Sequence, residues 1–468
     1  MAYVTNNGAV VTTSDAVDTN NVVYLGGIAI RKSDGAMHVT SGLTSAQLAA
    51  LAANGVPNDK IGIFGDSITA QNTTNTATNK YESALGYLVW SKILLNGNLT
   101  FDLANNYGVG GDTTAMMLAR ISAPLASGCR FMVVHGGTND VVAGAATYDY
   151  TVTTANLASI YSQLLLQGIT PIAVPIIPRS ADGVGGLLSV SKRRQIYRIN
   201  QWIRKYCAAN NGVLLADPTK NIVDYSATGS NIGDPIGGNS TSATAYTYDG
   251  LHPAPLGAWA IGKAIADALT ASGLLGSTRN YLFENPIDTY HATDNPTGNL
   301  LSNGAFIGVA GAKAGTATGT VADSWTLNGL AGVVAGSKST DTLDNGTTFA
   351  TQVITLGASG LCRLYEQVYA PAYLTVGDQV YLEMAVQVSS GVQILECHIQ
   401  LDDATVTAVC NKPSGNFYML PAWSGVLRTP IFTLTSIAVV TAYFEAKVDT
   451  AGSGVFELGK AAWRKVVA

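Results

Sequence analysis

Residues 61–68 read Ile61-Gly62-Ile63-Phe64-Gly65-Asp66-Ser67-Ile68, an apolar run that ends in a glycine, an acid and a serine. The apolar part does not alternate with polar residues, which is typical of a parallel strand buried on both faces. We expect further strands at 101–104, 130–134, 171–174 and 213–215, and helices at 81–95, 157–166, 191–208 and 256–269. Strands that alternate with helices predict an α/β domain over about residues 57–280, with a parallel sheet covered on both faces.

Two further regions flank this domain. Residues 1–56 contain expected strands at 22–25, 28–30 and 37–39 and an expected helix at 45–53. This segment is too short for a core of its own, so we expect it to pack on the next domain or on a partner chain. After about residue 295 the helical period disappears, and short alternating runs are separated by Gly, Asn, Asp and Ser. This pattern predicts a β-sandwich or jelly roll over residues 295–468.

Length and composition restrict the class of protein. A chain of 468 residues predicts two or three domains. Charged residues make up 12% of the chain and the net charge is −5, so no basic field is available for phosphates, and we expect no nucleic-acid partner. No apolar run reaches the roughly 18 residues of a membrane span, and we see no signal peptide. We therefore expect an extracellular protein, either part of a virion or secreted with its signal removed.

Neither the cysteines nor the histidines indicate a bound group. The five cysteines are widely spaced and form no C-x-x-C pair. We expect Cys129 and Cys207 to be buried as small hydrophobic residues. A disulfide among Cys362, Cys397 and Cys410 stays open. Because no cluster of His, Cys and acidic residues and no phosphate-binding loop is found, we expect no cofactor and no metal.

Four polar motifs stand directly after predicted strands or just before the last helix. Because the carboxyl ends of parallel strands share one edge of a sheet, we expect all four to meet there. The motifs are Gly65-Asp66-Ser67-Ile68, Gly108-Val109-Gly110-Gly111-Asp112-Thr113, Gly136-Gly137-Thr138-Asn139-Asp140 and Asp249-Gly250-Leu251-His252-Pro253.

These motifs contain what acyl transfer by a serine requires. A serine hydroxyl is a weak nucleophile unless a base removes its proton, and His252 is placed to be the base of Ser67. Asp249 stands three residues before His252 on the same loop, where it can hold the imidazole in one tautomer. The developing oxyanion needs preorganised donors. We expect these from the N–H groups of Ser67 and Gly111 and from the side-chain amide of Asn139.

The same residues resemble the four blocks of the SGNH (GDSL-like) hydrolase family. The matching residues are Gly65-Asp66-Ser67, Gly111, Gly137-Thr138-Asn139-Asp140 and Asp249-x-x-His252, in the order of the family. The resemblance covers about residues 57–280 and implies a flavodoxin-like three-layer α/β/α fold and a carboxylic ester hydrolase. It assigns the same roles: Ser67 as nucleophile, Gly111 and Asn139 as oxyanion donors, and Asp249 and His252 as the rest of the triad. A G-x-S-x-G elbow is missing, which disfavours the α/β-hydrolase family.

Other polar residues in the motifs have structural interpretations. We expect Asp66, Asp112 and Asp140 to bond nearby backbone in their turns. His135 ends a buried strand and is interpreted as a packing residue. Arg179 follows the fourth strand, where it lines the cleft or forms a surface salt bridge. The run Lys192-Arg193-Arg194 is interpreted as a solvated helix face.

The substrate is predicted from the loops and the C-terminal region. Residues 71–79 and 226–248 are rich in Asn, Thr, Gly and Tyr, flank the predicted site and suit a hydroxyl-rich ligand such as a sugar. A lipid chain would require an apolar tunnel, and no matching run of Leu, Phe or Met stands near the motifs. Residues 299–306, 322–325 and 456–463 resemble the opening and closing parts of jelly-roll carbohydrate-binding modules and of phage tail appendage domains, a fold that serves many functions.

Three hypotheses follow. The first is a carbohydrate O-acetylesterase on a phage tail spike or fibre, with an acetylated polysaccharide as substrate and residues 1–56 as an attachment or homotrimer element. The second is a secreted bacterial esterase that acts on plant polysaccharide or acyl lipid. The third is a receptor-binding tail protein whose hydrolase domain is only a scaffold. This hypothesis is disfavoured by the intact Ser67, Asn139 and His252.

Overall fold

The structure is a computed structural model. It describes residues 59–143, 149–183, 185–238, 242–275, 285–341, 349–369, 373–413, 415 and 417–466, together with the backbone of short strands within residues 1–58. These short strands form an antiparallel sheet in the order β2-β1-β5-β4-β3. They confirm the strands predicted within residues 22–39, whereas the helix predicted at 45–53 lies outside the described residues. The strands are β1 (Ala2–Val4), β2 (Val10–Thr12), β3 (Val22–Leu25), β4 (Ile28–Arg31) and β5 (Met37–Val39).

A parallel sheet forms the centre of the region between residues 59 and 275, which we call the catalytic region. Its strand order is β12-β11-β10-β6-β9, and each neighbouring pair is parallel. This is the flavodoxin-like order, in which ligands bind beyond the carboxyl ends of the strands. The strands are β6 (Ile61–Gly65), β9 (Asn106–Gly108), β10 (Phe131–His135), β11 (Thr170–Ala173) and β12 (Leu214–Leu215).

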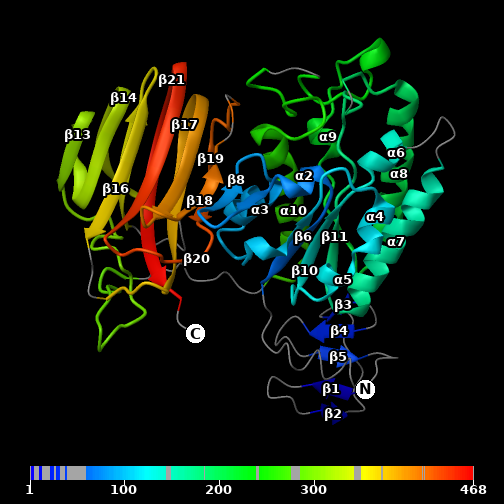
Figure 1. Cartoon of the computed structure of the whole chain (residues 1–468), viewed down its shortest axis with the longest axis horizontal. Coiled ribbons are helices and arrows are strands. Elements are labelled where there is room, and N and C mark those ends of the chain that lie inside the picture. The colour runs from blue at the N-terminus through cyan, green and yellow to red at the C-terminus, as the bar shows by residue number, and fades with distance from the viewer. Residues whose placement is uncertain are drawn as a thin grey trace.

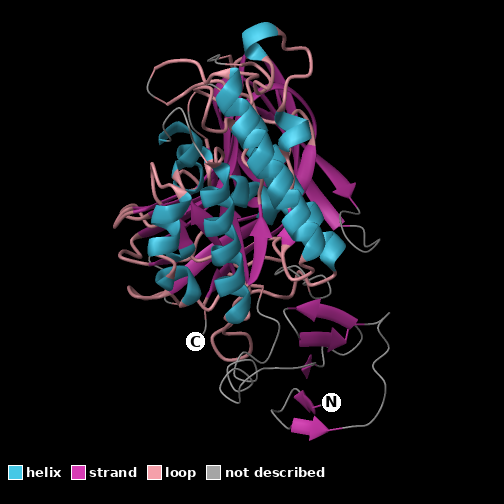
Figure 2. Cartoon of the chain, turned by 90° about the vertical axis from the view of Figure 1, so that its right-hand side faces the viewer, coloured by secondary structure: helices cyan, strands magenta, loops and turns pink. Residues whose placement is uncertain are grey.

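Helices pack against both faces of this sheet. Alternate residues of each strand point to opposite faces, so Ile63 packs with helices α3 and α10, whereas Phe64 packs with α7 and α8. The latter pair stands at the right of Figure 1 and in front of the strands in Figure 2. The helices are α2 (Ser67–Ala70), α3 (Tyr87–Leu94), α4 (Thr114–Ala119), α5 (Ser122–Leu125), α6 (Thr138–Ala143), α7 (Tyr150–Leu166), α8 (Val190–Ala209), α9 (Thr219–Ile222) and α10 (Pro255–Ser272), with 3-10 turns η2 (Leu103–Asn105) and η3 (Gly229–Asn231).

Two predicted elements of this region are wrong. The strand expected at 101–104 begins later, because the Asp102 carboxylate accepts a hydrogen bond from Ala104 N (2.9 Å) and starts the 3-10 turn η2 before β9. The helix expected at 81–95 begins at Tyr87, because residues 79–83 form a strand that pairs with the C-terminal part of the chain. In both cases hydrogen bonds decide the backbone conformation, and the apolar periodicity of the local sequence does not reveal them.

Residues 310–465 form an all-β region, which we call the C-terminal β region. Its longest strands change partners along their length: the first half of β21 pairs with β16, and the second half pairs with β15. The strands thereby enclose a single core that contains Trp325, Phe444 and Trp463. The strands are β13 (Ala310–Gly319), β14 (Val321–Asp341), β15 (Phe349–Leu356), β16 (Leu361–Tyr369), β17 (Gln379–Asp402), β18 (Thr407–Lys412), β19 (Trp423–Arg428), β20 (Phe432–Thr433) and β21 (Val439–Lys465).

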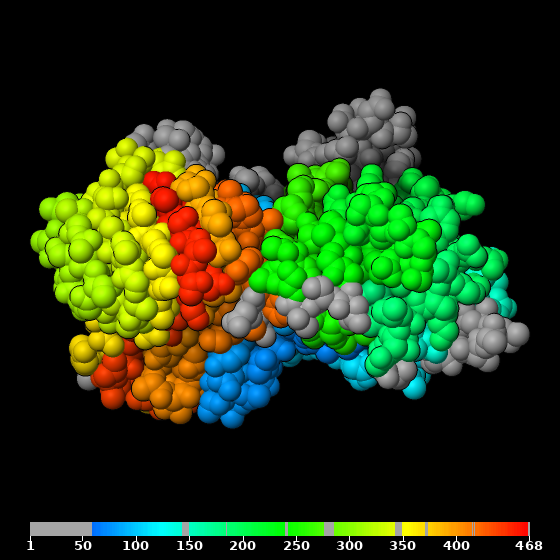
Figure 3. All heavy atoms as spheres, turned by 90° about the horizontal axis from the view of Figure 1, so that it is seen from above, coloured from blue at the N-terminus to red at the C-terminus, as the bar shows by residue number. Residues whose placement is uncertain are grey.

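The two regions share one sheet. The hairpin β7 (Thr73–Asn75) and β8 (Asn79–Ser83) leaves the catalytic region directly after α2 and adds to the C-terminal sheet, where β8 runs parallel to β18. Helix α3 reinforces this joint, because the Trp90 ring meets Trp423 of β19 edge to face at 5.6 Å. Figure 1 shows β8 beside β18, and Figure 3 shows orange atoms of the C-terminal β region against blue and green atoms of the catalytic region. The C-terminal β region is therefore built onto the catalytic region.

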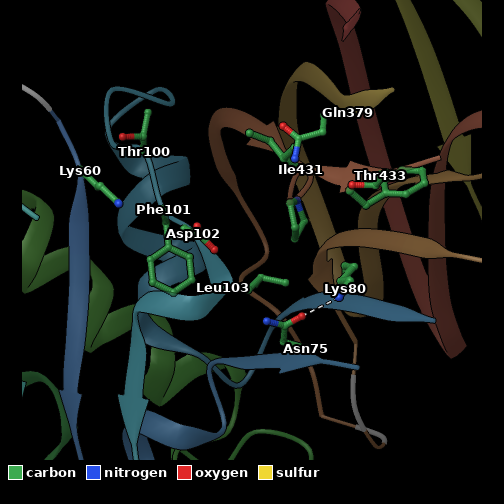
Figure 4. A pocket seen from close by; sticks show the side chains of 12 residues that line it. Lys60, Asn75, Lys80, Thr100, Phe101, Asp102, Leu103, Gln379, Ile431 and Thr433 are labelled. Carbon is green, nitrogen blue, oxygen red and sulfur yellow. Dashed lines mark hydrogen bonds between the residues drawn. The ribbon is translucent and has the colours of Figure 1, made fainter. Parts of the chain in front are cut away.

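A cavity of about 420 Å³ lies at this joint. Figure 4 shows Lys60 and Phe101 on one side of it, Gln379 and Thr433 on the other, and Asn75 of the β7–β8 hairpin at the bottom. Lys60 stands at the amino end of β6. The cavity is therefore at the opposite edge of the sheet from the polar motifs.

The cysteines and the helices bear on further expectations. Cys129 and Cys207 are buried, as predicted. Cys362, Cys397 and Cys410 are buried free thiols, so the disulfide left open among them is not formed. In the part of the chain that the structure describes, no helix has the length and apolar character needed to cross a membrane.

Candidate active site

The backbone places Ser67 where β6 ends and α2 begins. The Asp66 carboxylate caps this short helix by accepting a hydrogen bond from Ile68 N (3.0 Å), as expected for a structural acid in a turn. Gly65 permits the close approach of the neighbouring strand, because a Cβ at this position would stand 2.2 Å from the carbonyl oxygen of His135. The local sequence therefore holds the serine at the carboxyl edge of the sheet.

The predicted triad residues are brought together. The Ser67 Oγ and His252 Nε2 atoms are 2.8 Å apart, and His252 Nδ1 lies 2.6 Å from the Asp249 carboxylate. With the proton on Nδ1, this nitrogen donates a hydrogen bond to Asp249. The Nε2 atom is then free to accept a hydrogen bond from the serine hydroxyl. The geometry allows proton transfer from the serine to the imidazole.

The Asp249 carboxylate is fixed by its own loop. Its Oδ1 atom accepts the backbone N–H groups of Leu251 (2.9 Å) and His252 (2.7 Å). Burial would raise the pKa of Asp249, but the hydrogen bonds from the side chain and backbone of His252 hold that pKa below its usual value. Asp249 is therefore ionised at neutral pH and stabilises a protonated His252.

The predicted oxyanion donors surround Ser67. The loop that contains Gly111 is tied to the end of β6, because Val109 N donates to the Gly65 carbonyl oxygen (3.1 Å). Gly111 has a φ of +83°, a conformation that favours glycine. The N–H groups of Ser67 and Gly111 donate no hydrogen bond to any described residue, so both remain available for a substrate oxygen.

Asn139 is held beside the same loop. Its Nδ2 atom donates to the carbonyl oxygen of Asp112 (3.0 Å), which is the residue after Gly111. Because an amide carries two donor hydrogens, one is left for the substrate. The arrangement provides the third donor that the sequence predicts.

We expect Asn139→Ala to lower kcat of ester hydrolysis about 10²- to 10³-fold, because one preorganised donor is lost from the transition state. The KM should change far less, since the donor serves the oxyanion rather than the ground-state ester. Steady-state kinetics on p-nitrophenyl acetate measures both constants. A kcat within threefold of wild type would contradict the role of Asn139.

Asp112 and Asp140 were expected to bond the backbone of their own turns, but they join elements that are further apart in the sequence. Asp140 connects the second and third motifs by accepting hydrogen bonds from Thr114 N (2.9 Å) and Thr153 Oγ1 (2.9 Å). Asp112 forms an ion pair with Arg120 (2.6 Å), whose guanidinium also donates to the Gly65 carbonyl oxygen (3.0 Å). These contacts position the Gly111 and Asn139 donors relative to Ser67.

Arg179 is buried, so the alternative of a surface salt bridge does not hold. Its Nη1 atom donates to Thr138 Oγ1 (2.8 Å), and its Nε atom donates to the carbonyl oxygen of Ala181 (2.8 Å). Burial lowers the pKa of Arg179 to about 10, although nearby carboxylates raise it. The guanidinium is therefore charged at neutral pH. Because Ala181 N also donates to the Gly250 carbonyl oxygen (3.1 Å), Arg179 links the third motif to the His252 loop.

Asp66 and His135 are fully buried beneath the site. Burial raises the pKa of Asp66 to about 7, although the N–H of Ile68 and the charges of His252 and Arg179 lower it. Burial also lowers the pKa of His135 to about 4, so this ring is neutral and acts as the packing residue that was expected. At mildly acidic pH Asp249 is thus the ionised acid beside His252, and Asp66 is neutral.

One expectation about the flanking loops is wrong. Residues 73–79, expected to line the cleft, belong to the β7–β8 hairpin and lead away from Ser67 into the C-terminal sheet. Gln71 stays near the site, because its Oε1 atom accepts a hydrogen bond from the Tyr248 hydroxyl (3.4 Å). Arg193, expected on a solvated helix face, is buried and pairs with Asp234 (2.7 Å), which fixes part of the 226–248 loop.

Two aromatic residues near the site were not singled out from the sequence, although Tyr248 ends the 226–248 loop that was expected to flank it. The Tyr248 ring lies nearly parallel to the His252 ring, with an interplanar angle of 14° and centroids 5.6 Å apart. The Phe417 ring, from the C-terminal β region, lies 6.1 Å from the Tyr248 ring. Tyr248 directly precedes Asp249, so its position in the sequence was a usable signal. No local signal connects Phe417 with residues so far away in the chain.

One group of side chains could hold a metal ion. The ligand atoms of Glu396, His398 and Glu445 lie within 4.8 Å of one another in the C-terminal β region. Arg363 already pairs with Glu445 (2.6 Å), and Lys447 lies 3.6 Å from Glu396. Because these cations balance the two carboxylates, we assign the group to the packing of the sheet.

Comparison with known proteins gives a family match for the region that carries the motifs. Residues 63–260 match the GDSL-like Lipase/Acylhydrolase family. The match contains all five predicted site residues and supports acylhydrolase activity in this region. No curated protein matches the chain.

Several solved structures resemble about half of the chain. A GDSL-like lipase from Bacteroides thetaiotaomicron is 18% identical over 46% of this chain and 89% of its own, with a TM-score of 0.33. A member of the lipolytic G-D-S-L family from Veillonella parvula is 18% identical over 45% of this chain and 98% of its own, with a TM-score of 0.32. An acetyl xylan esterase is 18% identical over 45% of this chain and 99% of its own, with a TM-score of 0.33.

Proposed function

We propose, from the GDSL-like acylhydrolase match of residues 63–260, that the chain is a serine esterase that removes O-acetyl groups from a polysaccharide. The observation that carries the esterase activity is the hydrogen-bonded series Ser67–His252–Asp249. The same series weighs against a hydrolase domain that serves only as a scaffold, because a scaffold does not require a serine and its base at 2.8 Å.

The reaction proceeds in two halves. Ser67 Oγ attacks the carbonyl carbon of the acetyl ester while its proton passes to His252 Nε2, and the oxyanion is held by the N–H groups of Ser67 and Gly111 and by Asn139. Collapse breaks the ester C–O bond, His252 returns the proton to the sugar oxygen, and an acetyl-serine remains. Water then attacks this intermediate with His252 as base, which releases acetate and restores Ser67.

The openness of the site supports a polymeric substrate. The side chains of Asp249 and His252 are 40% and 20% exposed, and Gly110 and Gly111 are exposed on the other side of Ser67. A polysaccharide can lie across such a surface with one acetyl group at the serine. A long acyl chain would instead gain most from an enclosed apolar tunnel.

The flanking regions extend the proposal. The C-terminal β region, taken as a jelly-roll-like carbohydrate-binding module, holds the polysaccharide, and residues 1–56 attach the chain to a phage tail or form a homotrimer. The low charged fraction of 12% supports an extracellular or virion location. The proposed substrate thus belongs to a bacterial or plant surface, and the proposed partner is a phage tail or further copies of this chain.

The test compares acyl length and substrate class. We expect wild-type protein to hydrolyse p-nitrophenyl acetate faster than the butyrate and octanoate esters, and to release acetate from at least one of acetylated xylan, glucomannan and bacterial capsular polysaccharides. The Ser67→Ala variant serves as the blank. Preference for octanoate would replace the polysaccharide substrate by a lipid, and hydrolysis of acetate esters without acetate release from any glycan would remove the polysaccharide from the proposal.

A further inference from the structure

A loop of the C-terminal β region reaches the active site. It connects β18 and β19 and carries Phe417, whose ring lies 6.1 Å from the Tyr248 ring at an angle of 45°. Tyr248 in turn lies against the His252 ring. A row of three rings therefore runs from the C-terminal β region to the catalytic base.

Hydrogen bonds hold this loop on both sides. Tyr418 N donates to the carbonyl oxygen of Ala243 (2.9 Å), in the loop that leads to Tyr248. The Tyr418 hydroxyl donates to Asp449 of β21 (2.8 Å), and Met419 N donates to the carbonyl oxygen of Ile394 in β17 (2.8 Å). Because the loop is anchored to both regions, Phe417 is fixed beside the site before any substrate binds.

The two aromatic rings are not core residues. Both Tyr248 and Phe417 are only partly buried, and neither belongs to a core cluster of the described residues. The Tyr248 hydroxyl is directed to Gln71 (3.4 Å), next to the helix that carries Ser67. A partly exposed aromatic pair next to an open ester site offers flat apolar area, which suits the C–H face of a sugar ring.

We propose that Tyr248 and Phe417 form a sugar-binding wall of the active site, to which the C-terminal β region contributes Phe417. The wall stacks against the pyranose ring that carries the acetyl group, or against its neighbour, while Ser67 attacks the ester. The inference rests on the proposed polysaccharide esterase and names a part of its substrate site. It makes Phe417 a specificity residue, because it contacts the sugar and not the reacting atoms.

The experiment compares a sugar ester with an ester that has no ring. Wild type, Phe417→Ala and Phe417→Trp are assayed on chemically O-acetylated xylo-oligosaccharides and on ethyl acetate, with acetate release followed in a pH-stat. We expect Phe417→Ala to lower kcat/KM for the oligosaccharides about tenfold more than for ethyl acetate, as loss of one stacking contact should. Phe417→Trp should keep most of the wild-type kcat/KM for the oligosaccharides. Tyr369→Ala, at an exposed tyrosine of β16, is the matched control and should change neither rate.

Each other outcome has a defined meaning. If Phe417→Ala lowers kcat/KM equally for both esters, Phe417 only supports His252. If kcat/KM stays at the wild-type value for both esters, Phe417 does not contact the substrate. Either result overturns the proposed wall. If wild type hydrolyses neither ester, the proposed esterase fails instead. Binding then decides the wall separately: in the Ser67→Ala background, adding Phe417→Ala should raise the Kd for the acetylated oligosaccharides about tenfold, and an unchanged Kd would overturn it.

Discussion

Replacing Ser67 by alanine is expected to lower kcat/KM for p-nitrophenyl acetate by about a thousandfold or more, because no other hydroxyl stands at His252 Nε2 in the described site. His252→Ala should cost a similar factor, since an unactivated serine is a weak nucleophile. The two residues act as one unit, so the double variant should be scarcely slower than either single variant. Initial rates with purified protein, measured against the uncatalysed hydrolysis, give all three factors.

The control for this prediction is the fold. Ser67 is partly exposed, and its side chain forms a hydrogen bond to His252 alone among the described residues, so the thermal midpoint of Ser67→Ala should stay close to wild type. An active Ser67→Ala protein with more than a tenth of the wild-type rate would show that a different residue is acylated. Additive losses in the double variant would show that Ser67 and His252 act in separate steps.

Replacing Glu82 by alanine is expected to lower the free energy of unfolding by about 3–5 kcal/mol. Glu82 of β8 forms an ion pair with Lys92 of α3, and their side chains are only 2% and 5% exposed. Removal of the carboxylate leaves a buried ammonium group without its counter-charge, between the catalytic region and the C-terminal β region. Urea unfolding followed by tryptophan fluorescence reports on the change, because Trp90 and Trp423 lie at the same joint.

An exposed ion pair of the same chain is the matched control. Lys263 and Asp267 pair on α10 with side chains 43% and 64% exposed, so Asp267→Ala should cost about 0.5 kcal/mol or less. A second variant, Glu82→Met with Lys92→Met, removes both charges and should recover most of the stability lost in Glu82→Ala. A loss below about 1 kcal/mol in Glu82→Ala would contradict a desolvated pair.

The sequence predicts the catalytic residues because each of them follows a predicted strand or shares one short loop with its partner. Asp249 and His252 share one loop, and Ser67 follows the apolar strand that places it at the edge of the sheet. The continuous apolar strands also predict the parallel sheet, since burial on both faces leaves no polar positions. Asn139 and Gly111 are found in the same way, as polar or glycine residues directly after strands.

The residues that the sequence does not predict depend on distant partners. Residues 79–83 carry no strong strand pattern, and they become a strand because β18 supplies the hydrogen bonds. Arg193 has the spacing of a solvated helix position, but Asp234 and its loop cover it. Phe417 reaches Tyr248 only through the docking of the C-terminal β region. Local propensity contains no information about any of these contacts.

The ladder between β8 and β18 has a consequence for the order of folding. Asn79 pairs with Thr407, roughly 330 residues later in the chain. During synthesis the β7–β8 hairpin leaves the ribosome early, but the edge of β8 that faces away from β7 has no partner until nearly the whole chain has emerged. Contacts of such long sequence separation form slowly, and the unpaired edge of β8 is open to other chains in the meantime. The segment next to the nucleophile therefore completes its structure among the last, and we expect shortened chains that end before residue 407 to aggregate rather than to work as smaller esterases.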